Sequence, residues 1–268
     1  MAKFKRAVLA ANRISTCLHE EQGSDRFPVD VASVAKAYSA QMFTDPIVEV
    51  LGENFDGFEG MLKASKDNSR WMIVYNTAAN EGRRRFTLAH EFGHYMLHRE
   101  ERKLFECGGA NTQGDTLEKE ADTFAVTLLM PMDDFRNQII GETPSFELFS
   151  HLAERYGVSL MAAALRWIEI SPLRAVLVAS QEGMMAWASS TDAAYRTGAV
   201  FATRRYTIEL PASALAVREE APTYGEQQRV PARDWFNRAH PDAEVTEIMV
   251  AVDDYDYTLT LLLLPEVE

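Results

Sequence analysis

The stretch RRRFTLAHEFGHYMLH, residues 83–98, constrains this chain more than any other part of its sequence. Its apolar residues recur at helical spacing, so they predict a helix with one buried side. His90 and His94 are four residues apart and would therefore lie one above the other on the same face. Two imidazoles placed in this way can bind one metal ion, and Glu91 lies close enough to take a proton from a water on that ion. The pattern HExxH thus predicts a metal site on a packed helix.

A third metal donor must come from outside this pair, because a catalytic zinc ion takes three protein donors and keeps one position open for water. His98 is on the same face as the two histidines. It follows His90 by eight residues, however, a rise of ~12 Å along a straight helix. Three successive turns cannot converge on one ion with bonds of ~2 Å. We therefore expect His98 to support the site or the helix without binding the ion.

The next strong helix, predicted from Leu117 to Leu129, offers better donors. Glu118 and Asp122 share one face of it, so Glu118 can bind the metal while Asp122 holds a ligand histidine by its other ring nitrogen. Glu120 is the rival donor, although it points about 200° round the helix from Glu118. An acidic residue in the first turn also stabilises a helix without any metal. On the residues alone, Glu118 is favoured and Glu120 remains open.

The rest of the sequence predicts an α+β fold in two parts. Helical patterns at the N-terminus lead into short β-prone runs, at 47–51, 60–64 and 71–75, which predict a small, mostly antiparallel sheet beside the metal helix. After Leu173 the pattern changes to alternating strands and turns, with a hairpin around residues 181–183. We therefore expect one domain over residues 1–171 and a smaller α+β domain over residues 172–268.

Charge and composition restrict the classes of partner and compartment. The net charge of −13 disfavours direct nucleic-acid binding and suits a protein partner with basic patches. Cys17 and Cys107 are too few for a disulfide framework, which fits a reducing cytosol. The N-terminus has no apolar core of signal-peptide length, and no stretch approaches the ~20 apolar residues of a membrane span. These features predict a cytoplasmic protein without a membrane partner.

The substrate-binding residues are less well specified. Attack of a metal-bound water on a carbonyl also needs a donor for the oxyanion, and Tyr75, Tyr95, Arg85 and His98 are the candidates near the metal helix in sequence. The predicted strand 71–75 could offer its edge to an extended peptide, or be an ordinary core strand. Cys107, in the segment between the two metal-site helices, could approach the metal and block its open position, or be an unremarkable thiol.

Residues 83–98, together with the later segment EKEADTFAVTLLMP at 118–131, resemble the ImmA/IrrE family of metallopeptidases. That family pairs an AHExGH helix with a later E-x-x-A-[ND]-x-FA-x-x-LLMP helix. The similarity extends more weakly over residues 25–171, through FPVDVASVAKAYSAQ, GFEGMLKAS, WMIVYN and LAERYGVSLMAAALRW. Two linked motifs in the same order make it far more specific than HExxH alone.

The resemblance implies a zincin-like peptidase domain with a gluzincin-like third donor. Carried over by position, His90, His94 and Glu118 bind one zinc ion, or manganese or another divalent metal, and Glu91 is the catalytic acid/base. Asp122 stands where the family often has Asn. The implied activity is a zinc endopeptidase that cuts a specific protein, such as a helix-turn-helix transcriptional repressor, in a stress or mobile-element response. The C-terminal domain would then recognise the substrate or sense a signal.

Two other functions are compatible with these residues. The chain could keep its metal for stability alone and sequester a partner, for instance as one half of a toxin–antitoxin pair. The segment 152–167 also has a helix-turn-helix pattern, which would suit a DNA-binding regulator. It offers only Arg155 and Arg166 as basic residues, so we expect a helical pair that packs behind the metal site.

Overall fold

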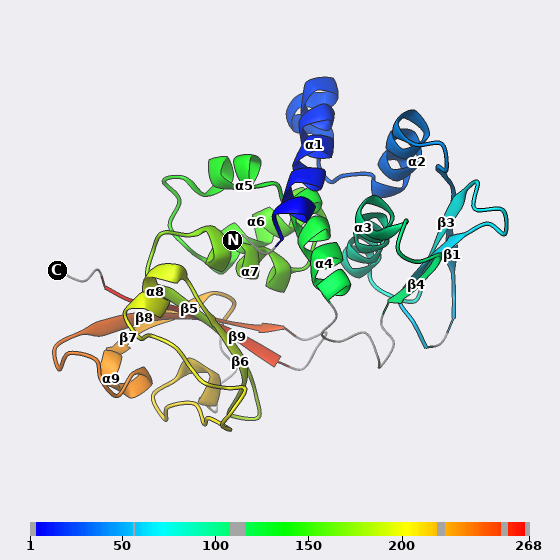
Figure 1. The fold of residues 1–268 in the computed structure, drawn as a ribbon. Coiled ribbons are helices and arrows are strands. Elements are labelled where there is room, and N and C mark those ends of the chain that lie inside the picture. Colours follow the sequence, from blue (N-terminus) through cyan, green and yellow to red (C-terminus); the bar gives the residue numbers. More distant parts are fainter. Residues whose placement is uncertain (1–3, 56, 108–115, 219–222, 253–256, 266–268) are drawn as a thin grey trace. The chain divides into compact units, whose positions relative to one another are not determined.

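The computed structural model describes residues 4–55, 57–107, 116–218, 223–252 and 257–265 (Figure 1). The chain divides into two compact units. The first comprises Met1–Gln138 and Ala153–Ser159, and the second comprises Ile139–Leu152 and Leu160–Glu268. Helices and two separate sheets confirm the α+β class. The chain crosses from one unit to the other three times, at residues 138–139, 152–153 and 159–160, all before residue 171. The single domain boundary predicted at residue 171 therefore stays a prediction.

Four helices build most of the first unit, and side chains cap two of them. Helix α2 begins after Asp30, whose carboxylate accepts the Ser33 N–H at 3.1 Å, as its sequence predicts. Helix α3 begins after Asn80, whose side chain accepts the Arg83 N–H at 2.9 Å. The helices are α1 (Lys5–Gln22), α2 (Val31–Met42), α3 (Glu81–His98) and α4 (Thr116–Leu129), with a short 3-10 turn η1 (Gly23–Arg26) after α1.

Helix α4 packs closely on α3 at one glycine. A Cβ placed on Gly93 would lie 3.1 Å from the Ala121 Cα and 3.1 Å from the Phe124 Cδ1. Such distances are shorter than ordinary van der Waals contact, so only glycine allows the two helices to approach this far. The close approach sets Glu118 of α4 opposite the histidines of α3.

The sheet of the first unit has the order β1-β3-β2-β4. Strand β1 pairs parallel with β3, and the other two pairings are antiparallel, in agreement with a mostly antiparallel sheet. The strands are β1 (Ile47–Glu53), β2 (Gly60–Ala64), β3 (Trp71–Asn76) and β4 (Leu104–Cys107). Strand β3 is hydrogen-bonded on both sides, so of the two alternatives for residues 71–75 it is the ordinary core strand and offers no free edge to a peptide. Within the described residues the edges of this sheet are β1 and β4, and the sequence pattern did not predict β4.

The second unit contains an antiparallel sheet of order β6-β5-β9-β8-β7. The predicted hairpin joins β5 to β6 through Glu182 and Gly183, which both have positive φ. The β-prone segment YTIEL, residues 206–210, for which its composition predicts a strand, forms only an isolated bridge from Glu209 to Met184. The polar turn that the residues Asp253–Asp256 predict lies outside the described residues. The strands are β5 (Ala175–Gln181), β6 (Met184–Ser190), β7 (Glu226–Pro231), β8 (Glu244–Val252) and β9 (Tyr257–Leu263).

Short helices and one apolar cluster complete the second unit. Strand β5 is buried over six consecutive residues, 175–180, because both of its faces are covered. One face carries a core that includes Val176, Trp235 and Leu262. The helices of this unit are α7 (Leu160–Ile170), α8 (Asp192–Arg196) and α9 (Ala232–Trp235), with the 3-10 turn η2 (Leu215–Val217). Helix α5 (Met132–Ile139) lies in the first unit except for its last residue, and α6 (Phe146–Tyr156) is divided between the two units. Among the described helices we find none with the length and apolar character needed to cross a membrane.

Candidate metal centre

Three predicted donors meet between α3 and α4. The Nε2 atoms of His90 and His94 are 3.1 Å apart. The two carboxylate oxygens of Glu118 lie 3.4 Å from the His90 Nε2 and 3.3 Å from the His94 Nε2. Both histidines are buried, whereas Glu118 is partly exposed. Helix α3 thus supplies two donors one turn apart, and the first turn of α4 supplies the third.

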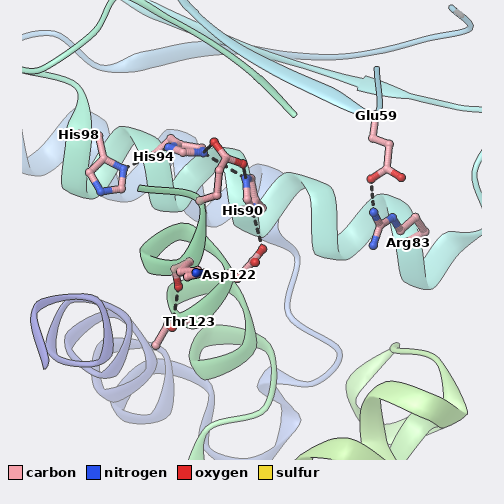
Figure 2. A network of polar contacts seen from close by, with 9 residues as sticks. Glu59, Arg83, His90, His94, His98, Asp122 and Thr123 are labelled. Carbon is pink, nitrogen blue, oxygen red and sulfur yellow. Dashed lines mark hydrogen bonds and ion pairs between the residues drawn. The ribbon is translucent and has the colours of Figure 1, made fainter. Parts of the chain in front are cut away.

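Hydrogen bonds at the far side of each ring fix where the protons lie. The His90 Nδ1 is 2.9 Å from an oxygen of Asp122, which as a carboxylate can only accept, so this nitrogen carries the proton (Figure 2). The His98 Nε2 donates in the same way to Glu120 at 2.9 Å. The His98 Nδ1 is therefore an acceptor and takes a proton from the His94 Nδ1 at 3.1 Å. When both rings are neutral, as a metal requires, their Nε2 atoms are left with a lone pair.

This donor set fits a divalent metal ion. Two nitrogen lone pairs and a carboxylate face one another at 3.1–3.4 Å, and such acceptors repel unless a cation lies among them. Without a metal, protons on the histidines take the place of this cation: burial works to raise the pKa of Glu118, but hydrogen bonds from His90 and His94 outweigh it and lower the pKa to about 2. Two imidazoles and one carboxylate are also the donor types of a catalytic zinc site with an open position.

The two rival donors of the sequence lie elsewhere. Glu120 does not face the histidine pair: it accepts from His98, which is fully buried. His98 contacts the ring of His94 from behind through its Nδ1. Helix geometry explains both positions, because Glu120 points to a different side of α4 from Glu118, and His98 is two turns from His90. Glu120 and His98 thus orient a donor, as Asp122 does for His90.

Glu91 is buried beside the donors without a hydrogen-bond partner. Its side chain is 0% exposed, and neither carboxylate oxygen has a partner among the described residues. Burial raises the pKa of Glu91 to about 8. Gly60 of β2 makes room for this side chain, since a Cβ there would lie 3.0 Å from the Glu91 Oε1 and 2.4 Å from the Thr87 Cγ2. A buried acid held close to neutral pKa can accept and return a proton.

The raised pKa of Glu91 predicts a pH-dependent stability of the metal-free protein. The pKa is about 8 in the folded chain and 4.5 in its ordinary state, so the folded chain binds this proton more tightly. Stability is greatest below the lower value and falls as pH rises through the window between them. Glu91→Gln removes the titrating group. In urea unfolding without metal, we expect the variant to exceed the wild type by a few kcal/mol at pH 8 and to match it near pH 4. An equal difference at both pH values would contradict this account.

The other predicted substrate-binding residues have structural contacts. Tyr95 is fully buried and donates its hydroxyl proton to the Asp45 carbonyl at 3.0 Å. Arg85 donates to the carbonyls of Gly157 and Val29 at 3.1 Å and 3.0 Å. Tyr75 and Arg85 line a cavity of about 320 Å³ whose lining contains none of the three metal donors. Their contribution to substrate binding therefore stays a prediction, and these contacts give Tyr95 and Arg85 a packing role.

Sequence reasoning missed Phe105 of β4. Its ring stacks on that of His94, with centroids 4.4 Å apart and an angle of 22° between the planes. Phe105 is buried and covers the donor from the sheet side. The only signal was the short apolar run at Leu104–Phe105 after a charged segment, which is too short to predict a strand.

Comparison with known proteins agrees with these two helices. A peptidase family model described as the IrrE N-terminal-like domain matches residues 46–167. The radiation response metalloprotease IrrE of Deinococcus radiodurans is 30% identical over 116 residues, 42% of this chain and 35% of that protein. The uncharacterized immunity region protein 2 of Bacillus phage phi105 is 39% identical over 79 residues, 27% of this chain and 44% of that protein. The chain thus matches less than half the length of either relative.

A solved structure of a Mycobacterium tuberculosis transcriptional regulator aligns over 97% of this chain and 76% of its own length, with a TM-score of 0.57. At 14% sequence identity this is a likeness in fold alone. The match over residues 46–167 contains all three donors, Glu91 and the residues that orient them. Over residues 46–167 the chain therefore carries an IrrE N-terminal-like domain, as the resemblance to the ImmA/IrrE family predicts.

Proposed function

We propose that this protein is a zinc-dependent endopeptidase that cuts a specific protein substrate. The observation that carries the proposal is the meeting of three lone-pair donors beside a buried, unpartnered acid. His90, His94 and Glu118 would hold the metal. Bound there, a zinc ion supplies a polarised water and a Lewis acid for the scissile carbonyl.

The protein's own residues then move the proton. Glu91 accepts a proton from the attacking water and later passes it to the leaving amine, for which a pKa near neutrality is suited. Asp122 and the His98–Glu120 pair hold the two donor rings in the tautomer that presents Nε2. Packing by Phe105 on His94 excludes water from the back of the site.

The edge of β4 is the place where an extended substrate would pair. The carbonyls of Lys103 and Cys107 face β2, because they accept the N–H groups of Ala64 and Glu59 at 3.0 Å and 2.8 Å. Backbone groups alternate in direction along a strand, so those of Leu104 and Glu106 face away from β2. Within the described residues no strand pairs with that side. A peptide added there would run past Phe105, which touches a metal donor.

Glu106→Pro tests this edge, because proline removes the outward N–H of residue 106 without removing a hydrogen bond to β2. We expect kcat/KM for a peptide substrate to fall about tenfold, because the variant loses one hydrogen bond to the peptide and holds the peptide less well aligned with the metal. Glu106→Ala is the matched control, since it removes only the side chain and should retain wild-type cleavage. Equal cleavage by the proline variant and the alanine control would exclude pairing at this edge.

The proposed substrate is a helix-turn-helix transcriptional repressor in the cytoplasm. Support comes from the names of two relatives, one a radiation response metalloprotease and one a phage immunity region protein. The net charge of −13 also suits a partner with the basic surface of a DNA-binding protein, and disfavours direct nucleic-acid binding by this chain. The C-terminal unit would recognise this substrate or sense the signal for cleavage.

The test is incubation of the zinc-loaded protein with the purified repressor encoded beside its own gene. Appearance of two defined fragments, absent with a chelator and with the Glu91→Gln variant, would support the proposal. A repressor that is bound but left intact by wild type would instead identify a partner-binding protein, as in a toxin–antitoxin pair.

A further inference from the structure

Strand β4 brings a thiol to the metal centre. Residues 105 and 107 point to the same face of the strand, because side chains alternate along it. Phe105 stacks on His94. Cys107 follows Phe105 by two residues along the strand, and it lies near His90, which precedes His94 by one helical turn. The repeat of two strand residues, ~6.7 Å, is close to the rise of four helical residues, ~6 Å. The two elements therefore stay in register over both contacts.

The backbone of Cys107 is held in place by β2. It pairs with Gly60, and its carbonyl accepts the Glu59 N–H at 2.8 Å. The side chain is free of any disulfide and only partly exposed. Anchored in this way, the sulfur cannot move far from α3.

The sulfur belongs to a second donor group that shares His90 with the first. The donor atoms of His90, Glu91 and Cys107 all lie within 4.8 Å of one another. Two donors of one tetrahedral ion are about 3.5 Å apart when their bonds are 2.0–2.3 Å, so the sulfur must move toward His94 and Glu118 to share an ion with them. Independently of the thiol, both oxygens of Glu91 are buried there without a partner, which marks this side of His90 as the place for a ligand.

We propose that Cys107 binds the metal as a fourth protein donor and closes the site in the resting enzyme. The inference rests on the metal site of the proposed function. Three protein donors leave a position for water, whereas a fourth thiolate donor gives the closed coordination of a structural zinc site. Because the donor atoms of His90, Glu91 and Cys107 lie within 4.8 Å of one another, the thiolate would compete with the attacking water beside Glu91. Substrate cleavage then requires the sulfur to leave the metal.

Cobalt(II) substitution tests the bond directly, because a thiolate donor gives a sulfur-to-cobalt charge-transfer band and imidazole or carboxylate donors do not. We expect the band in the cobalt-loaded wild type and in Cys17→Ser, which removes the exposed cysteine of α1. The band should vanish in Cys107→Ser while the visible bands of bound cobalt remain. Zinc affinity of Cys107→Ser should fall about tenfold or more, and its cleavage rate should rise several-fold.

The outcomes separate this inference from the proposed function. Cobalt that binds wild type without the charge-transfer band would overturn the role of Cys107 and leave the metal site intact. Failure of wild type to bind cobalt or zinc would overturn the proposed function itself. A band that is present with no gain in cleavage for Cys107→Ser would refute the closing of the site. Cys107→Ala provides the second variant should the serine variant fold poorly.

Discussion

Glu91→Gln is expected to abolish cleavage of the substrate while leaving the metal bound. Glutamine keeps the shape of the side chain but cannot accept the proton of the attacking water. General-base catalysis contributes about 10²–10⁴-fold to such a step, so kcat should fall by at least ~10²-fold. The measurement is a single-turnover cleavage assay with metal content determined on the same preparation.

The pH profile of the wild type provides the control for this assignment. A base acts in its ionised form, so activity should rise with pH through the pKa of Glu91. Burial raises that pKa to about 8 without a metal, and a nearby dication lowers it, so the acid limb should lie below pH 8. Cleavage by the glutamine variant at the wild-type rate would remove Glu91 from the mechanism.

Glu118→Gln should lose the metal, and Glu120→Gln should largely retain it. Glu118 is the charged oxygen donor that faces both histidines, and replacing it leaves two neutral donors. We expect zinc affinity to fall by more than ~100-fold in Glu118→Gln. Glu120 acts only through His98, so its loss should cost about tenfold to 100-fold. Competition titration against a chromogenic chelator measures both.

These two variants are matched, because both remove one charge from the same helix by the same substitution. A greater loss of zinc from Glu120→Gln than from Glu118→Gln would assign the third donor to the wrong face of α4. Circular dichroism of both variants shows whether α4 remains folded.

The helical pair His90 and His94 shows what local spacing can predict. Four residues bring two side chains to one face of any α-helix, so their relation needs no knowledge of the rest of the fold. Glu91 follows from the same geometry. The sequence distinguished Glu118 from Glu120 less clearly, because the two residues lie on different faces of α4. Only the packing of α4 on α3 at Gly93 decides which of these faces meets the histidines.

Contacts between distant segments explain where sequence reasoning failed. The composition of the strand Trp71–Asn76 suits an edge strand and a central strand equally well. Its position in the sheet is set by its two neighbours, β1 and β2. Tyr95 adjoins His94 in sequence, but one residue further round the helix it faces the core, against Trp71 and Phe43, which residue spacing alone did not show. Strand β4 is too short for a periodic pattern and forms because β2 offers it an edge.

The sequence by itself predicted the residues of a metal site: two imidazoles one turn apart, a glutamate beside them and an acidic helix further along the chain. Helix periodicity is a local property, so these relations can be read from residue spacing. Only the tertiary structure decided which tautomer each histidine adopts, which acid faces the pair, and that Cys107 lies beside His90. Those relations join α3 to α4 and β4, and such non-local packing depends on the whole core and not on residue spacing.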